Sequence, residues 1–244
     1  MIKTILKTLL LLAAVGYLIF ALAKVSRPAN DMVCTGVEYQ FADSGQTALI
    51  DCKMVEHQLA QYKIAPKGCK LADIDIRDIE QKLSQNPYID TATCYHTAAG
   101  KLCIRIRPLH PLLHVFDDGG DEFYVDRQGR IMPAGGLSVN LPIITGHANR
   151  KFASTRLITL AQLLTEDPYW SHQAQQVYVD SKGNIEITPS YAGQRILLGE
   201  PKNLENKLQR VRLFYEKGLP KIGWNKYNVI NATYNKQIIC SKEK

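Results

Sequence analysis

The sequence predicts an α+β protein: an N-terminal single transmembrane helix, a soluble domain with the element order β-α-α-β-β, and a mostly antiparallel β domain with two helices. Residues Thr8 to Ala23 contain no charged side chain. Residues 33–107 show one strand pattern, two helix patterns and a hairpin, and beyond Pro108 and Pro111 short strand patterns separated by turns predominate. A chain of 244 residues is long enough for a core in each of two domains.

The uncharged N-terminal stretch predicts a membrane anchor. Lys3 and Lys7 precede it, and 16 helical residues would span about 24 Å of a hydrocarbon core about 30 Å thick. The alternative is a cleaved signal peptide ending at Ala23, and either reading exports the rest of the chain. We favour an uncleaved anchor at residues 8–24 behind a cytoplasmic tail of residues 1–7. The positions expected within the membrane are Thr8, Leu12, Gly16, Phe20 and Ala23.

The first soluble domain is expected at residues 30–111. The segment VCTGVEYQF (33–41) alternates as a strand does, and Asp51 and Asp75 are typical helix N-caps. One sheet with two helices on one face would bury a compact core. The inward-facing helix residues are expected to be Val55, Leu59 and Tyr62, then Ile76, Ile79 and Leu83, and the hairpin strands are expected at 89–95 and 102–107.

Six cysteines become informative in an exported chain, because disulfides persist in oxidising compartments. In the segment TCYHTAAGKLCI, a loop at Ala98 and Ala99 would place Cys94 directly opposite Cys103. Opposed Cβ atoms lie about 4.5–5.5 Å apart, slightly wide for a bridge. Cys94 and Cys103 are therefore a candidate disulfide, and two free, half-buried thiols are the alternative.

The β domain is expected at residues 112–240, followed by a charged tail at 241–244. Helical spacing predicts one helix at about 154–165 and a longer one from Pro201 to about 217, ended by a glycine and a proline. The segments YNVINATY and QIIC are expected to close the chain as strands.

Two similar segments, YVDRQGRIMP (124–133) and YVDSKGNI (178–185), each place an aspartate three residues before a glycine. Paired carboxylates would suit acid–base catalysis. A strand that ends in Asp, followed by two variable residues, Gly and a new strand, is instead typical of a hairpin turn. We predict turns at Asp126 and Asp180 rather than a catalytic pair.

The sequence favours an interaction protein over an enzyme. It contains no common hydrolase, zinc-protease, phosphate-loop or dinucleotide motif, and Pro111 between His110 and His114 excludes a helical metal pair. The net charge of +7 comes from Lys and Arg mixed with acids, which indicates a solvated surface rather than nucleic-acid binding. We expect no cofactor, no metal and no nucleic-acid partner.

The last strands predict a binding surface, because a strand at a sheet edge can accept a partner strand. The alternative is an ordinary closing hairpin of the core. Val229, Asn231 and Thr233 would share one face of this strand. The residues expected to bind a partner are Ile230, Asn231, Ala232, Thr233, Tyr234, Gln237, Ile238 and Ile239.

The order of these parts resembles the bacterial FtsQ/DivIB cell-division family. Residues 71–116 are similar to the second helix, hairpin and arginine-proline exit of its POTRA domain. YVDRQGRIMP resembles the turn that opens its β domain, and LGEPKNLENKLQRVRLFYEKG (198–218) resembles its late helix. The chain departs from the family in its six cysteines, its short N-terminal tail, and Thr233 before Tyr234, where the family usually has arginine.

The resemblance implies a non-enzymatic periplasmic scaffold of the divisome. It implies a single-pass inner-membrane protein with its N-terminus in the cytoplasm and its bulk in the periplasm. Its expected partners are FtsB- and FtsL-like small coiled-coil membrane proteins and other divisome proteins. One partner would add a strand within 230–239, with Tyr234 and Ile238 setting the register, and the protein would help control septal peptidoglycan synthesis. The alternatives are a cleaved secreted periplasmic protein, such as a cell-wall-acting enzyme, or a POTRA chaperone or transport module.

Overall fold

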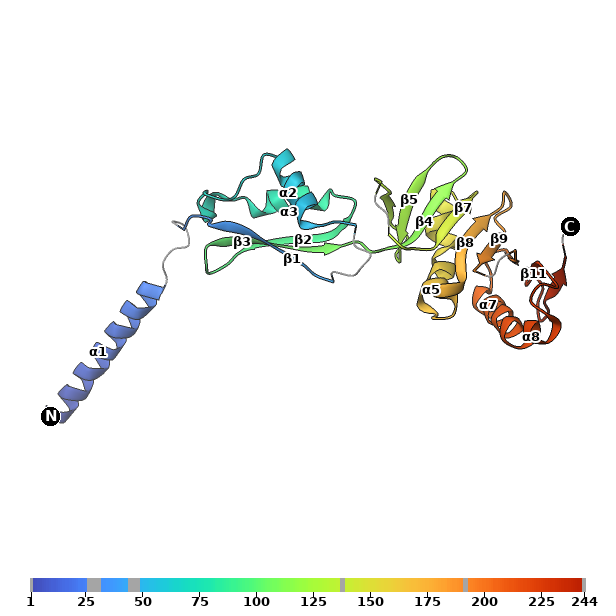
Figure 1. The fold of residues 1–244 in the computed structure, drawn as a ribbon. Helices are drawn as coiled ribbons and strands as arrows, with labels where there is room; N and C mark the ends of the chain where they lie inside the picture. Colours follow the sequence, from blue (N-terminus) through green and yellow to red (C-terminus); the bar gives the residue numbers. More distant parts are fainter. Residues whose placement is uncertain (1, 26–31, 44–48, 137–138, 191–192, 243–244) are drawn as a thin grey trace.

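The computed structural model consists of one helix followed by two sheets with covering helices (Figure 1). The helix α1 (Ile2–Val25) stands apart at the N-terminal end and exposes Leu12 and Phe20. None of the helices in the described ranges combines the length with the apolar character that crossing a bilayer requires. Met1, residues 26–31 and the last two residues of the predicted tail lie outside the described residues. Those described are 2–25, 32–43, 49–136, 139–190 and 193–242.

The first sheet domain has the predicted β-α-α-β-β order. Its strands lie in the order β1-β3-β2, with β3 parallel to β1 and antiparallel to β2. Both helices cover one face of the sheet (Figure 1). The elements are β1 (Gly36–Phe41), α2 (Cys52–Gln61), a 3₁₀ turn η2 (Leu71–Asp73), α3 (Ile76–Ser84), β2 (Ile89–His96) and β3 (Lys101–Pro108).

The helices of this domain begin at the aspartates that predicted them. The Asp51 carboxylate accepts a hydrogen bond from the Met54 N–H at 2.8 Å, and the Asp75 carboxylate accepts one from the Asp78 N–H at 3.0 Å. Each aspartate thereby satisfies one of the free amides in the first turn of a helix.

The inward faces of these helices follow the predicted spacing with one exception. Tyr62 was expected to face inward, but it is 38% exposed because α2 ends at the residue before it. Ile76 is half-buried. The buried positions are Val55, Leu59, Ile79 and Leu83.

The predicted opposition of Cys94 and Cys103 is wrong by one residue. The β2–β3 ladder pairs Cys94 with Ile104 and Tyr95 with Cys103. Because neighbouring residues of a strand point to opposite faces, this shift places the two thiols on opposite faces of the sheet. Both cysteines are buried and free, so the candidate disulfide is not formed.

The second domain contains a nine-stranded mixed sheet in the order β12-β11-β10-β9-β8-β7-β4-β5-β6. The pairs β4/β7, β7/β8 and β10/β11 are parallel and the other five are antiparallel, which agrees with the mostly antiparallel domain expected. The strands are β4 (Pro111–Asp117), β5 (Glu122–Asp126), β6 (Ile131–Pro133), β7 (Ile143–Gly146), β8 (Ala174–Val179), β9 (Ile185–Pro189), β10 (Arg195–Gly199), β11 (Val229–Asn231) and β12 (Ile239–Ser241).

The helical segments of this domain outnumber the two predicted. The helix expected at 154–165 is divided into α4 and α5. The helix expected at 201–217 begins after Asn203 and continues past Gly218, because Pro220 lies in the first turn of α8, where its missing amide is not needed. The segments are α4 (Arg150–Arg156), α5 (Ile158–Glu166), α6 (Trp170–Gln173), α7 (Leu204–Leu213), a π turn η3 (Phe214–Gly218) and α8 (Leu219–Ile222).

The two domains share part of a core at their junction. Tyr124, Met132 and Ala134 from the second domain are buried in the same apolar cluster as the first domain's helices and strands. The Tyr88 hydroxyl of the first domain also donates to the Pro133 carbonyl at 3.0 Å. The remaining strands of the large sheet pack against α5, α7 and α8 in a second cluster.

Candidate functional site

The last strand of the chain lies at an edge of the large sheet, as the sequence predicted. β12 pairs antiparallel with β11, which pairs parallel with β10, and β6 occupies the opposite edge. Among the described residues, β12 has no strand on its outer side. Figure 1 places this edge at the end of the molecule away from α1.

The predicted binding segment 230–239 is not one continuous strand. β11 ends at Asn231 and β12 begins at Ile239, and a loop of residues 232–238 connects them. Ile230 and Ala232 are fully buried. Their side chains therefore support the sheet and are not available to a partner.

The loop nevertheless carries exposed side chains beside the open edge. Tyr234 is 50% exposed and Ile239 is 45% exposed. Thr233 and Gln237 are also exposed, and Asn231 is half-buried. Ile238, which was expected to help set the register of a partner strand, packs against the core instead.

The start of the loop is fixed by contacts with its neighbours. The Ala232 N–H donates to the Leu197 carbonyl of β10, and the Thr233 N–H donates to Asn231 Oδ1, both at 2.9 Å. Gly199 has a φ of +66°, and a Cβ there would lie 2.8 Å from Thr233 Cγ2. The loop therefore packs closely on the end of β10.

Helix α7 supports β10 through a buried lysine that sequence reasoning missed. The Lys207 ammonium donates to the carbonyls of Leu198 at 2.7 Å and Glu200 at 2.8 Å. Burial lowers the pKa of Lys207 below its usual value. The sequence feature that could have predicted the burial of Lys207 is its position between Leu204 and Leu208, inside the apolar stripe of the helix.

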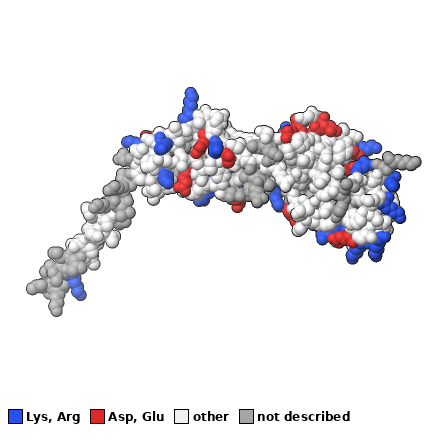
Figure 2. Space-filling model, in the orientation of Figure 1, with Lys and Arg blue, Asp and Glu red and all other residues white. Residues whose placement is uncertain are grey.

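The basic side chains are not spread evenly, contrary to the sequence interpretation. Residues 195–244 contain eleven Lys and Arg against four Asp and Glu, a surplus equal to the +7 of the whole chain. On the face drawn in Figure 2, basic side chains gather at the C-terminal end of the second domain. The candidate edge therefore lies in a positive region that attracts acidic segments.

The two D-x-x-G segments are turns, as predicted. Asp126 and Asp180 each accept two backbone hydrogen bonds on one carboxylate oxygen, and Gly129 and Gly183 both have a φ of +79°. The donors are the N–H groups of Gln128 (2.9 Å) and Arg130 (2.8 Å) in the first turn, and of Lys182 and Asn184 (both 2.8 Å) in the second.

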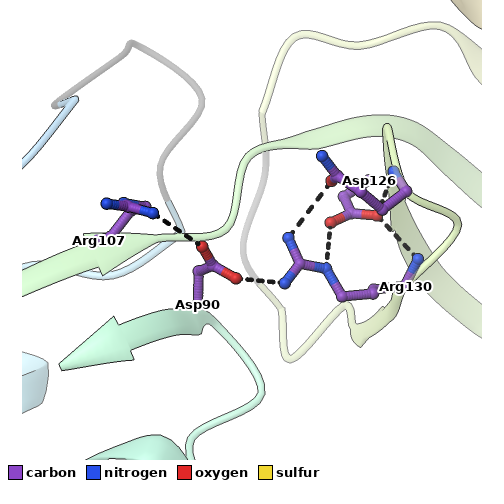
Figure 3. Close-up of polar contacts among 5 residues, drawn as sticks. Asp90, Arg107, Asp126 and Arg130 are labelled. Carbon is purple, nitrogen blue, oxygen red and sulfur yellow. Dashed lines mark hydrogen bonds and ion pairs between the residues drawn. The ribbon is translucent and has the colours of Figure 1, made fainter.

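The first turn has an additional role at the domain junction (Figure 3). The Arg130 guanidinium donates to Asp126 at 2.6 Å and to Asp90, which lies on β2 of the first domain. Arg107 of β3 lies 3.8 Å from the same Asp90 carboxylate. The hydrogen bond with Asp90 raises the pKa of Arg130 above its usual value. This cluster links charged groups of the two domains.

A cavity of about 760 Å³ lies at this junction, lined by both domains. Two ion pairs lie in its lining, because Arg127 and Glu166 pair at 2.6 Å and Asp90 pairs with Arg130. Across the described ranges, no three His, Cys, Asp or Glu side chains gather as metal ligands would. The geometry of the junction is that of an interdomain contact.

Comparison with known proteins decides the family. The model described as "FtsQ/DivIB, C-terminal related" matches residues 110–241, which is more than half of the chain. The chain belongs to the FtsQ/DivIB family. The model of a POTRA-like domain matches residues 32–107, in agreement with the β-α-α-β-β sheet domain.

A relative within curated proteins extends this FtsQ/DivIB assignment along the chain. The cell division protein FtsQ of Rhodothermus marinus (strain ATCC 43812 / DSM 4252 / R-10) is 26% identical over 201 residues, which cover 76% of this chain and 72% of the relative. Membership of the FtsQ/DivIB family implies a role in cell division.

Proposed function

We propose that this FtsQ/DivIB-family protein is a non-enzymatic scaffold of the divisome that binds FtsB- and FtsL-like membrane proteins by strand addition at β12. The observation that carries the proposal is the position of β12. It is the outermost strand of the sheet in the domain that matches the family model. A partner strand would extend the sheet by pairing with its backbone.

The size of β12 sets what strand addition can contribute. A net backbone hydrogen bond contributes about 0.5–1.5 kcal/mol, so pairing along three residues gives only a few kcal/mol. Side-chain contacts must supply the rest of the affinity. Tyr234 and Ile239 are the exposed apolar groups beside the edge, and the positive region around them favours an acidic partner segment.

The membrane anchor is part of the same proposal. Its support is the uncharged stretch 8–23, the helical conformation of α1 and the family assignment. In this arrangement the N-terminus is cytoplasmic, the two sheet domains are periplasmic, and the protein acts on septal peptidoglycan synthesis through its partners. Mass spectrometry of the mature N-terminus tests the anchor, since a chain that starts at Lys24 would overturn it.

The binding proposal is tested by affinity capture of the full chain from membranes. We expect two short coiled-coil membrane proteins to be recovered with the parent and lost with Ile239→Asp, which places a charge on the exposed side of β12. Ile143→Asp is the matched control, because Ile143 is 40% exposed on β7, five strands away. Capture that survives Ile239→Asp, or that fails equally with Ile143→Asp, would contradict the assignment of the interface to β12.

Proline substitutions in the loop give a less direct test. The amides of Ala232 and Thr233 both donate hydrogen bonds within the protein, to Leu197 and to Asn231. A proline at either position removes one of these bonds and therefore disturbs the fold together with the edge.

A further inference from the structure

An arginine on α7 holds the loop between β11 and β12. The Arg210 guanidinium donates from Nη1 to the carbonyls of Tyr234 at 2.6 Å and Gln237 at 3.3 Å, and from Nη2 to the Ala232 carbonyl at 3.1 Å. These three carbonyls span most of the loop. One side chain therefore fixes both its beginning and its end.

The edge strand β12 has little pairing of its own. β11 and β12 have three residues each, and their ladder contains three residue pairs. β11 is also paired with β10, but β12 has no second strand beside it among the described residues, so its pairing is marginal without further support. Hydrogen bonds from a charged donor are roughly twice as strong as neutral ones, so Arg210 supplies much of what keeps β12 in place.

The chemistry of arginine suits this role. A planar guanidinium presents several N–H groups in a fixed fork, which can reach carbonyls at different points of a loop at the same time. Lysine would offer a single ammonium to the same carbonyls. Lys207, three residues earlier on α7, binds the end of β10 in that simpler way.

Arg212 shows that the contact is specific to one position of the helix. Its guanidinium pairs with Glu216 at 2.8 Å and lies 3.6 Å from Asp167 and over the Tyr169 ring, so its contacts among the described residues point away from the loop. Arg212 therefore provides a control with the same chemistry on the same helix.

We propose that Arg210 is the positioning residue of the candidate binding edge: it fixes the 232–238 loop and thereby keeps β12 paired with β11 and open to a partner strand. The partner half of this inference rests on the proposed function of β12. The positioning half concerns the free protein and can be measured without a partner.

Hydrogen exchange of the full chain in detergent tests the positioning. In Arg210→Met, which keeps the apolar stem and removes the donors, we expect the amides of β12 to exchange at least roughly tenfold faster, as the loss of a charge-assisted hydrogen bond predicts. Arg210→Lys should restore part of the protection. In Arg210→Met, the exchange rate of the Ile187 amide in β9 should stay within about twofold of the parent. In Arg212→Met, the exchange rates of all amides should stay within the same limit. Equal β12 protection in the parent and Arg210→Met would overturn the proposal.

Affinity capture with the same variants separates the two halves. If β12 exchanges faster in Arg210→Met and the coiled-coil partners are lost, with partial recovery in Arg210→Lys, both halves hold. If β12 exchanges faster and capture is unchanged, Arg210 does not position a binding edge and the strand-addition proposal fails with it. If exchange and capture are both unchanged, Arg210 does not position β12 and the proposed function of β12 stands.

Discussion

Replacing Asp126 by asparagine separates two roles of the first D-x-x-G turn, because the same change at Asp180 affects only one of them. Both aspartates accept two backbone hydrogen bonds of 2.8–2.9 Å on one oxygen, and an asparagine oxygen can keep these. The second oxygen differs between the turns. At Asp126 it accepts from the Arg130 guanidinium at 2.6 Å, and at Asp180 it accepts from the neutral Asn184 amide at 2.8 Å.

The expected losses follow from these partners. A hydrogen bond to a charged group contributes about 1.5–3 kcal/mol, and the Asp126 side chain is only 2% exposed. The Arg130 side chain is 44% exposed, so water recovers part of the loss and we expect Asp126→Asn to cost about 2 kcal/mol. The neutral bond at Asp180 predicts a loss of about 1 kcal/mol or less for Asp180→Asn.

Urea unfolding of the full chain, followed by fluorescence of the buried Trp170, measures both losses. The two variants are each other's control, since their turns share the same backbone geometry. Equal losses at the two positions would refute the reasoning that the ion pair at the junction adds stability.

The same experiment has a defined pH dependence. Burial acts to raise the pKa of Asp180, but hydrogen bonds from Asn184 and Lys182 outweigh it and lower the pKa below the usual 3.8. A lowered folded pKa contributes stability above the unfolded value, and this contribution is lost as pH falls through the folded value. The stability difference between parent and Asp180→Asn should therefore shrink below about pH 4.

Three further changes test other parts of the structure. Lys207→Met should cost about 2 kcal/mol in urea unfolding, because it leaves two carbonyls at the end of β10 without their donor, whereas Lys217→Met on the exposed side should have almost no effect. Gly146→Ala should destabilise by more than about 3 kcal/mol in the same assay, since its Cβ would lie 2.2 Å from a carbonyl oxygen at a φ of +90°. Peptide mapping of the oxidised full chain should find no Cys94–Cys103 crosslink, and a native crosslink would show that the β2–β3 register is wrong.

Local features of the fold could be predicted from the sequence because their causes lie within a few residues. Asp51 and Asp75 begin helices because each side chain reaches an amide three residues later. The turns at Asp126 and Asp180 form because each aspartate side chain accepts a hydrogen bond from the amide two residues later, and the glycine three residues later donates to the aspartate carbonyl.

Features that depend on register or on distant neighbours were missed or misplaced. A shift of one residue in the hairpin turn moved Cys103 to the face opposite Cys94. The Asp90–Arg130 contact joins residues forty positions apart, and no local sequence pattern predicts it. The late helix continues past Gly218 because Leu219 is buried in the core, and tertiary packing overrides the local stop signal.

The candidate site was predicted in location and not in detail. The sequence placed a binding edge in the last strands, and β12 is at an edge. Arg210, which holds the loop beside this edge, is on a helix more than twenty residues before the loop. It binds backbone carbonyls, so the identities of the loop residues do not reveal the contact.

Photo-crosslinking from the two edges of the large sheet tests the central claim most directly. A photoreactive residue would be placed at Ser241 in β12 or at Pro133 in β6, which lie at opposite edges of the same sheet. In dividing cells, we predict a crosslink from position 241 to a short coiled-coil membrane protein and none from position 133. A crosslink to that protein from position 133 alone would contradict binding at β12.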